Sequence, residues 1–480
     1  MKKMAVIFTM LLYCFLLNGC GKDEIGYSIM SGTASETRTS VEEEAATSQP
    51  DMETLFMEAM GIEILTEEEK EERKSTRENV ITLGMVGKNS YLQRSVSNFN
   101  GAQEDCWVEI QKYESKEALL LDAVRGQGPD IISVYKGLDL YSLAEKGVVE
   151  DLVPYFESSE VVKREDIVTS IWRAGSIEDK MYYVIPRFEP KIFLVEKGYT
   201  DDGVWSVDDY LALAEKYPEG KISECITASG QYSIFTLDLG MAFESYIDWE
   251  KQSCSFECAE FINLLEKLKS YIEKSYVMES ASLAEQMYNK ELLTKKVELC
   301  WDYRMTKYRD LKKSMLDFCE IAGVPNDSGQ LMYSMVCWEN YAINAASDKK
   351  ELAWSFLEFL LSGEYQYKLM DNWHGGDNLF PVRYDVLESS LQAEMNRYNE
   401  EPHYYKNSFT GERVCFDPEF TEEDVQVILD IVENCYFEYT VKGDINNILV
   451  EEILYYFDGK KSVKEVVEVI QNRVSLYLME

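Results

Sequence analysis

The chain has 480 residues, of which 87 are acidic and 48 basic, giving a formal net charge of −39 at pH 7. Nucleic-acid binders need a basic face, so this charge argues against that class. Hydrophobic residues make up 46% of the chain and aromatic residues 12%, enough to build packed cores and to exclude a disordered protein. Because only His374 and His403 are present, we expect neither a histidine-based metal site nor a Ser-His-Asp triad, and no cofactor.

The first twenty residues have the layout of an export signal. Lys2 and Lys3 precede an apolar run, Ala5–Leu17, that is too short to span a bilayer. The run ends in LNGC at Cys20, which resembles the lipobox of bacterial lipoproteins, whose cysteine thiol receives a diacylglyceryl group. We therefore expect a signal peptide over residues 1–19 and a lipid anchor on Cys20, placing the chain on the extracellular face of the cell membrane. The alternative is an ordinary signal peptide with an incidental cysteine.

Residues 20–79 are predicted to form a flexible stalk. Residues 31–50 are rich in Ser, Thr, Glu and Ala without helical or strand periodicity. Thr66–Glu78 has mixed charge, so both a solvated helix and further stalk remain open there. The nine mature-chain cysteines other than Cys20 have an odd count and scattered spacing, which argues against a complete disulfide framework.

Short apolar strands and helices alternate from Val80 onward. Strands are expected at 80–87, 106–110 and 130–134, and helices at 91–99 and 116–124. This order is the βαβ pattern of an α/β domain with a largely parallel sheet. Ligands on such sheets bind at the carboxyl ends of the strands. The candidate binding residues at these ends are Lys88, Asn89, Tyr135 and Asp139.

The remainder of the chain is mostly helical in pattern. Ser206 and Asp209 form a capping-box variant that opens a helix. Further elements are expected as helices at 261–272, 348–361, 445–457 and 463–478, and as strands at 297–301 and 341–344. The last two helices make up a C-terminal helical extension.

The sequence contains no phosphate-binding loop, nucleophile elbow, zincin helix or dinucleotide fingerprint. Instead, aromatic residues lie near expected loop ends beside polar residues. Sugar rings stack their apolar C–H faces on aromatic rings, and their hydroxyls need donors and acceptors. These further candidates for binding a carbohydrate are Arg187, Phe188, Glu189, Tyr232, Trp301, Asp302, Tyr303, Arg304, Trp338, Glu339 and Trp373. Core packing is the alternative for each aromatic residue.

Several segments resemble one family in the same order along the chain. They are Gly128–Ile132 (GPDII), Tyr141–Leu152 (YSLAEKGVVEDL), Lys180–Pro186 (KMYYVIP), Ala342–Leu360 (AINAASDKKELAWSFLEFL), Phe380–Val382 (FPV) and Ile470–Val474 (IQNRV). The family is the extracellular solute-binding proteins of the maltodextrin-binding type, including the longer sugar-binding lipoproteins of Gram-positive gut bacteria.

The resemblance implies an α/β, two-lobed periplasmic-binding-protein-like (type II) fold with a hinge. Lobe I would hold about 80–187 and 341–382, and lobe II about 190–338 and 384–480. A carbohydrate bound in the cleft would stabilise the closed state, and the closed monomer would dock on the permease subunits of an ABC importer. Val134 stands where the maltodextrin binder has tryptophan, which argues against maltodextrin itself. Trp301 is the best match to the family's lobe II tryptophan.

Two alternatives of other classes remain open at this point. The same fold would also suit a non-sugar solute such as a peptide, a polyamine or a vitamin. A surface glycosidase or adhesion lipoprotein is the second alternative. No pair of carboxylates is marked out for glycoside hydrolysis, so we expect no catalytic residues and no enzymatic activity.

Overall fold

The computed structural model describes residues 65–133, 140–222, 243, 245–248, 251–272, 282–302, 305–370, 379–400, 404–406, 413–415, 419–437 and 443–479. The expected signal peptide and Cys20 lie outside these ranges. Within them, no helix has both the length and the apolar character needed to cross a bilayer.

The first sheet has four strands in the order β14-β3-β1-β2. Their bounds are Asn79–Val86 for β1, Cys106–Tyr113 for β2, Ile131–Ser133 for β3 and Tyr341–Ile343 for β14. β1 runs parallel to β2 and β3, whereas β14 is antiparallel to β3. Helices α4 (Ser90–Ala102) and α5 (Lys116–Val124) make the crossovers. The predicted βαβ units are therefore confirmed.

The Gly-Pro-Asp segment joins α5 to this sheet. A Cβ on Gly128 would lie 2.6 Å from the Ala123 Cα, so only glycine fits against the helix backbone. The Asp130 carboxylate accepts hydrogen bonds from Thr82 N at 2.8 Å and from Ser347 Oγ at 2.6 Å. It thereby ties the start of β3 to β1 and to the turn before helix α13 (Lys350–Leu361).

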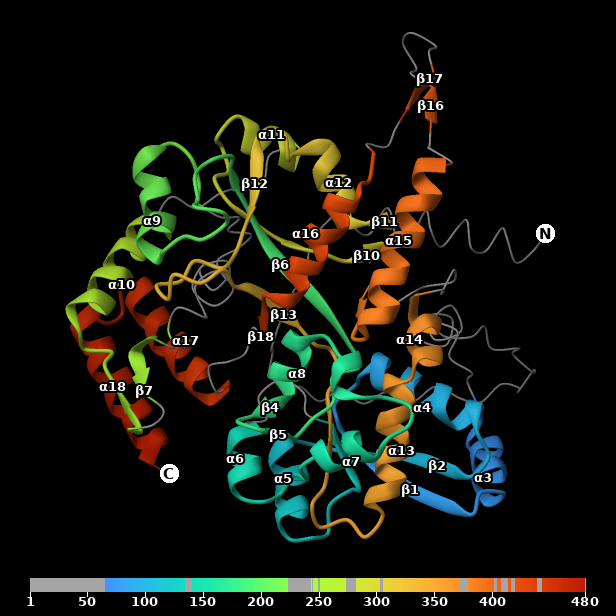
Figure 1. Ribbon diagram of the computed structural model, residues 1–480. Helices are drawn as coiled ribbons and strands as arrows, with labels where there is room; N and C mark the ends of the chain where they lie inside the picture. The colour runs from blue at the N-terminus through green and yellow to red at the C-terminus, as the bar shows by residue number, and fades with distance from the viewer. Residues whose placement is uncertain are drawn as a thin grey trace, which may run out of the picture. The chain divides into compact units, whose positions relative to one another are not determined.

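The second sheet is built around the long strand β6 (Arg187–Glu196), shown in green in Figure 1. Its order is β12-β6-β13-β18, and β9 and β15 also pair with β6. The bounds are Lys295–Glu298 for β9, Cys319–Ala322 for β12, Tyr333–Val336 for β13, Phe380–Pro381 for β15 and Cys435–Phe437 for β18. The expected single strand at 297–301 is wrong. β9 ends at Glu298, Leu299 N donates to Pro190 O, and the chain then enters the separate hairpin β10–β11.

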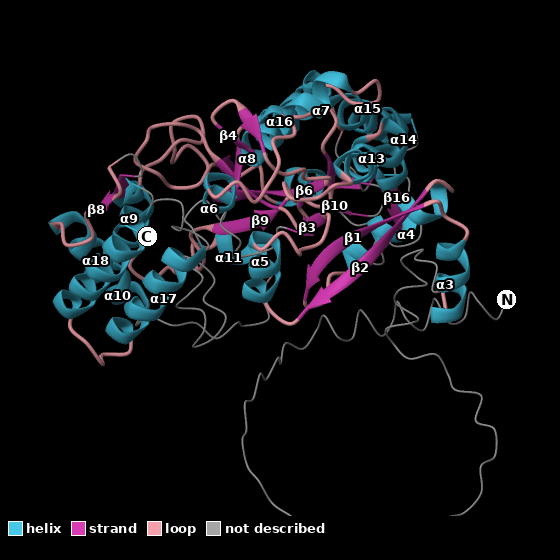
Figure 2. Cartoon of the chain, turned by 90° about the horizontal axis from the view of Figure 1, so that it is seen from below, coloured by secondary structure: helices cyan, strands magenta, loops and turns pink. Residues whose placement is uncertain are grey.

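Helices and short hairpins complete the described chain (Figure 2). The remaining helices are α3 (Glu67–Ser75), α6 (Leu140–Glu145), α7 (Val153–Ser158), η1 (Arg164–Asp166), α8 (Thr169–Gly175), α9 (Val207–Lys216), α10 (Ala259–Ile272), α11 (Leu283–Tyr288), α12 (Lys307–Ser314), α14 (Gly363–Met370), α15 (Tyr384–Glu400), α16 (Glu422–Glu433), α17 (Gly443–Phe457) and α18 (Val463–Met479). The hairpins are β4 (Ser176–Ile177) with β5 (Lys180–Met181), β7 (Ile247–Asp248) with β8 (Ser253–Cys254), β10 (Trp301–Asp302) with β11 (Met305–Thr306), and β16 (Tyr404–Lys406) with β17 (Arg413–Cys415).

The described residues form two hydrophobic cores. One core fills the first sheet, its helices and much of β6. The other lies where α9, α10, α17 and α18 pack, and it includes Phe193 and Val195 of β6. Figures 1 and 2 both show α10, α17 and α18 gathered together, away from β1 and β2. The predicted helices at 445–457 and 463–478 are confirmed, and their apolar faces form part of the second core.

Helix α3 lies within the stretch predicted as stalk. Thr66 and Glu69 form a capping box at its start, as expected for the helical alternative at Thr66–Glu78. Lys74 Nζ bonds to Glu109 Oε1 of β2 at 2.9 Å, and the Arg77 guanidinium donates to Asn100 O at 3.2 Å. These contacts fix α3 beside the first sheet.

The described chain carries free thiols at Cys106, Cys254, Cys258, Cys300, Cys319, Cys337 and Cys435. Burial raises the pKa of the Cys319 thiol to about 11 and raises the pKa of Cys337 well above its usual range. Cys106, Cys319, Cys337 and Cys435 are all buried. Packing, rather than disulfide bonding, therefore accounts for these positions.

Candidate functional site

The loop after β1 brings two distant parts of the sequence together. Gly87 has a φ of 71°, which turns the chain out of the strand and exposes Lys88. Asn89 is the N-cap of α4, and its Oδ1 accepts from Leu92 N at 3.1 Å. Its Nδ2 donates to Trp338 O at 2.9 Å, across 249 residues of sequence. Three of the predicted site residues therefore lie at one place.

Tyr91 joins this group, although the sequence analysis did not select it. Its ring stacks on Trp338 with centroids 6.2 Å apart and an interplanar angle of 26°. Burial, together with the nearby Glu189 and Glu339 carboxylates, raises the pKa of Tyr91 against the opposing effect of Arg187. Its position in the first turn after a strand's carboxyl end was the sequence signal that would have found it. The residue was instead counted within the helix predicted at 91–99.

Arg187 and Glu339 form a buried ion pair next to Tyr91. Their side chains are 1% and 0% exposed, and Arg187 Nε donates to Glu339 Oε1. The Arg187 Cζ lies 5.5 Å from the centroid of the Tyr91 ring. Burial alone would lower the pKa of Arg187, but Glu339 outweighs it and the pKa is raised. The Arg187 guanidinium therefore stays charged at neutral pH.

Three hydroxyls complete the polar group around this ion pair. Ser95 Oγ donates to Glu339 Oε2 at 2.9 Å and accepts from the Arg187 Nη2 at 2.7 Å. The Tyr341 hydroxyl donates to Glu339, and the Arg187 Nη2 also donates to the Tyr365 hydroxyl at 3.3 Å. Ser95 comes from α4, Tyr341 from β14 and Tyr365 from α14, so the ion pair joins three elements of the fold.

A second buried side chain, Gln366, joins two neighbouring segments of the chain. Gln366 of α14 is 0% exposed. Its Nε2 donates to Pro186 O at 2.8 Å, and its Oε1 accepts from Val382 N at 2.8 Å. Phe188 packs against Phe380 with ring centroids 5.9 Å apart and is fully buried. These contacts hold the segments at 186–188 and 380–382 side by side, and the backbone hydrogen bonds between Val184 and Tyr341 hold 338–341 beside them.

The other predicted site residues have separate placements. Glu189 is 6% exposed and pairs with Val336 of β13 across the second sheet. Trp301 and Asp302 form β10, which pairs with β11, and their side chains lie outside the described part of the structure. Tyr135, Asp139, Tyr232, Tyr303, Arg304 and Trp373 also lie outside the described residues.

The charges near the aromatic pair are of both signs. Arg94 of α4 is 3% exposed. Its pKa is lowered mainly by burial and also by the positive charge of the nearby Arg187. Together with Arg187, Glu189 and Glu339, Arg94 places two cations and two carboxylates around Tyr91. Among the described residues, no cluster of three or more His, Cys, Asp or Glu side chains would hold a metal ion.

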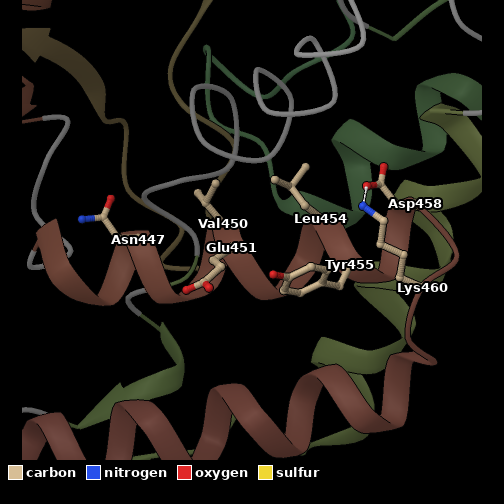
Figure 3. Close-up of a pocket in the computed structure, with 7 residues that line it drawn as sticks. All are labelled: Asn447, Val450, Glu451, Leu454, Tyr455, Asp458 and Lys460. Atoms are coloured by element: carbon tan, nitrogen blue, oxygen red, sulfur yellow. Dashed lines mark hydrogen bonds and ion pairs between the residues drawn. The ribbon is translucent and has the colours of Figure 1, made fainter. Parts of the chain in front are cut away.

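A separate pocket lies on the C-terminal helices (Figure 3). Its volume is about 320 Å³, and α17 and the turn that follows supply its lining. Figure 3 shows Asp458 and Lys460 pointing toward each other, and their ion pair measures 2.8 Å. Glu451 pairs with Arg473 at 2.8 Å. None of the predicted binding residues lines this pocket, and its charged side chains are paired within the helical hairpin.

Comparison with protein families gives one match that spans most of the described body. Residues 95–403 match the family of bacterial extracellular solute-binding proteins. The chain belongs to this family. Curated proteins offer no match to the sequence of this solute-binding protein.

Solved structures give the same fold. This solute-binding protein is similar to an ABC transporter solute-binding protein from Thermotoga lettingae bound with α-D-tagatose, at 15% identity and a TM-score of 0.52, covering 83% of this chain and 100% of that one. It is also similar to the sugar-binding protein MalE from Xanthomonas citri, at 15% identity and a TM-score of 0.53, covering 83% and 97%. A third similar structure is a substrate-binding protein from Listeria monocytogenes in complex with cycloalternan. It is 16% identical with a TM-score of 0.51, and the match covers 84% of this chain and 99% of that one. The predicted two-lobed α/β fold is confirmed.

Proposed function

We propose that this extracellular solute-binding protein captures a carbohydrate between its lobes and delivers it to an ABC importer. The observation that carries the proposal is the partly exposed Tyr91–Trp338 aromatic pair beside Asn89 and the exposed Lys88. Aromatic rings beside hydrogen-bonding groups are what a sugar ring requires. The similarity to proteins solved with tagatose and cycloalternan is consistent with this ligand class.

Hinge closure is the mechanism that fits a two-lobed binder. A ligand that touches both lobes stabilises the closed state by its higher affinity for that state. The first lobe would hold residues 80–187 and 341–382, and the second 190–338 and 384–480. The closed monomer would then present both lobes to the permease. No catalytic step is part of this function.

Calorimetric titration with a panel of mono- and oligosaccharides tests the ligand class. Binding of at least one sugar supports the proposal, and no heat from any sugar contradicts it. A parallel panel of short peptides and polyamines tests the alternative of a non-sugar solute. The affinity for a polyamine should fall steeply with salt, whereas the affinity for a neutral sugar should hardly change.

Substitution of the aromatic pair tests the site. Trp338→Ala and Tyr91→Ala should each weaken sugar binding by about tenfold or more, corresponding to about 1.4 kcal/mol. Tyr288→Ala is the matched control because Tyr288 of α11 is 67% exposed and packs only at a ring edge, against Phe318. Unchanged affinity in both site variants would place the sugar elsewhere.

Lipid anchoring through Cys20 is the second part of the proposal. The residues LNGC and the apolar run before them support it. A diacyl anchor supplies two buried chains, enough for stable attachment. Metabolic labelling with a fatty acid should mark the wild type and not Cys20→Ser, and a wild-type protein without label would contradict the anchor.

A further inference from the structure

Arg187 and Glu339 were selected from the sequence as binding residues, and their burial indicates a different role. Their side chains are 1% and 0% exposed. The Glu339 carboxylate already accepts from Arg187, Ser95 and Tyr341. A ligand in the cleft would meet Tyr91 and Trp338, both of them partly exposed, before either member of the ion pair.

We propose that Arg187 and Glu339 are positioning residues, whose buried pair holds Tyr91 and Trp338 in the arrangement that receives the ligand. This inference rests on the proposed function of the same site. It assigns the ion pair to the geometry of the aromatic pair rather than to contact with the ligand.

Glu339 is connected to Tyr91 through Ser95 and Arg187. Ser95 follows Tyr91 by four residues on α4, so both side chains lie on the same face of the helix. Arg187 touches this face twice, with its Nη2 at 2.7 Å from Ser95 Oγ and its Cζ at 5.5 Å from the Tyr91 centroid. The ion pair therefore fixes the rotation and height of the first turns of α4.

Glu339 is also connected to Trp338. The two residues are neighbours in the chain, so three hydrogen bonds to the Glu339 carboxylate also restrain the backbone at Trp338. The Asn89–Trp338 hydrogen bond of 2.9 Å closes the connection on the other side. Both stacked rings are thus carried by backbone segments that one ion pair joins.

The energetics of a buried ion pair also favour a positioning role. Well-packed apolar residues of similar volume often stabilise a fold as well as a buried ion pair does, so stability alone is weak reason for charges at this place. Charged hydrogen bonds are directional and short, and they fix orientation as well as distance. Here they connect β6, α4, α14 and the segment before β14.

The test removes both charges together, so that neither is left buried without its partner. The variant R187M/E339L should fold with a cooperative unfolding transition. Affinity for the sugar that binds the wild type best in the calorimetric panel should fall about tenfold. Amide hydrogen exchange without ligand should become about tenfold faster in residues 88–95 and 335–341, while α17 and α18 exchange as before.

A matched control removes an ion pair elsewhere in the molecule. Lys312 Nζ bonds to Asp424 Oδ2 at 2.5 Å between α12 and α16, and the Asp424 side chain is 7% exposed. K312M/D424L should change neither the affinity nor exchange in the two segments. If R187M/E339L does not fold, two milder variants serve instead: Ser95→Ala removes the hydrogen bonds of the Ser95 hydroxyl with Glu339 and Arg187, and Tyr341→Phe removes the bond from Tyr341 to Glu339. Each should raise local exchange by about threefold or more.

The outcomes separate the inference from the proposed function. Unchanged exchange in both segments overturns the inference, and so does faster exchange with unchanged sugar affinity, because the pair would then only stabilise the fold. If no sugar binds the wild-type protein, the proposed function fails. The exchange result then decides by itself whether the pair holds these two segments.

Discussion

Arg187 and Arg473 both pair with glutamates, yet their surroundings differ. Arg187 and Glu339 are almost fully buried, and hydroxyls from three elements complete their hydrogen bonds. Arg473 lies on α18, is 39% exposed, and bonds to Glu451 at 2.8 Å and Glu452 at 2.9 Å of α17. Arginine and glutamate therefore pair in the interior at Arg187–Glu339 and near the surface of a helical hairpin at Arg473–Glu451.

The difference lies in what holds each region together. In the hairpin, apolar residues such as Leu449 and Ile470 form the packed interior, and the partly exposed Arg473 and Lys461 reach the buried Glu452 carboxylate from the surface. Around Arg187 and Glu339, the charged side chains are themselves part of the interior, and the nearby Gln366 bonds to backbone atoms of two neighbouring segments. Removing the buried Glu339 should therefore lower the stability of the fold strongly, whereas removing the partly exposed Arg473 should lower it little.

Glu339→Ala should give the largest loss of stability. It leaves the Arg187 guanidinium buried without its carboxylate, and breaking a buried pair in this way typically costs about 3–5 kcal/mol. The free energy of unfolding in urea measures the effect. A loss below about 1 kcal/mol would mean that water reaches Arg187 and that the two ion pairs are not so different.

Leu449→Ala should be the corresponding large change in the hairpin. Leu449 is 0% exposed in the second core, and truncating a buried leucine costs about 3 kcal/mol through lost burial and the cavity it leaves. Urea unfolding again provides the measurement. Leu476→Ala on α18 is the control, since Leu476 is 64% exposed and its loss should change stability by less than about 0.5 kcal/mol.

Glu196 represents an intermediate case between the two ion pairs. Burial opposes ionisation, but Lys216, Tyr217 and Lys290 outweigh it and lower the pKa of Glu196 from 4.5 to about 2. Because the folded pKa lies below the unfolded one, the stabilisation is complete above about pH 4.5 and is lost as the pH falls toward 2.

Glu196→Gln should therefore cost about 1 kcal/mol at pH 6, after allowance for solvent screening of a carboxylate that is 27% exposed. The difference between the wild type and this variant should shrink between pH 4.5 and pH 2. Unfolding experiments across this range measure it. A difference independent of pH would show that the three partners do not favour the ionised form.

Arg473→Ala should have the smallest effect. Exposed ion pairs typically contribute about 1 kcal/mol or less, and Glu452 keeps its bond to Lys461 at 2.6 Å. The loss in unfolding free energy should decrease further at high salt. A loss comparable to that of Glu339→Ala would break the contrast between the two regions.

Local patterns were enough to predict the first sheet and the C-terminal helices. The strands at β1, β2 and β3 are short apolar runs, and the helices between them carry their own caps, such as Ser115 for α5. Sheet membership depends on tertiary contacts. The break between β9 and β10 could not be read from residues 297–301, because it depends on where β6 ends its pairing with β9.

The sequence predicted several residues of the site but not how they are arranged. Asn89, Arg187, Trp338 and Glu339 were all selected from the sequence, but no pattern pairs residues that lie 249 positions apart. The burial of Arg187 depends on Ser95 and Tyr365, which come from separate helices. Tyr91 escaped selection because helical periodicity explains it equally well.

The buried thiols have a consequence for how the protein must be handled. Thiolate is the form that attacks disulfides and oxidants, and burial holds the pKa of Cys319 at about 11 and that of Cys106 above its usual value. The buried thiols of the native fold are thus slow to oxidise, whereas the same thiols in the denatured chain are not. Refolding therefore competes with formation of non-native disulfides, and a reductant present during refolding should raise the yield of native protein.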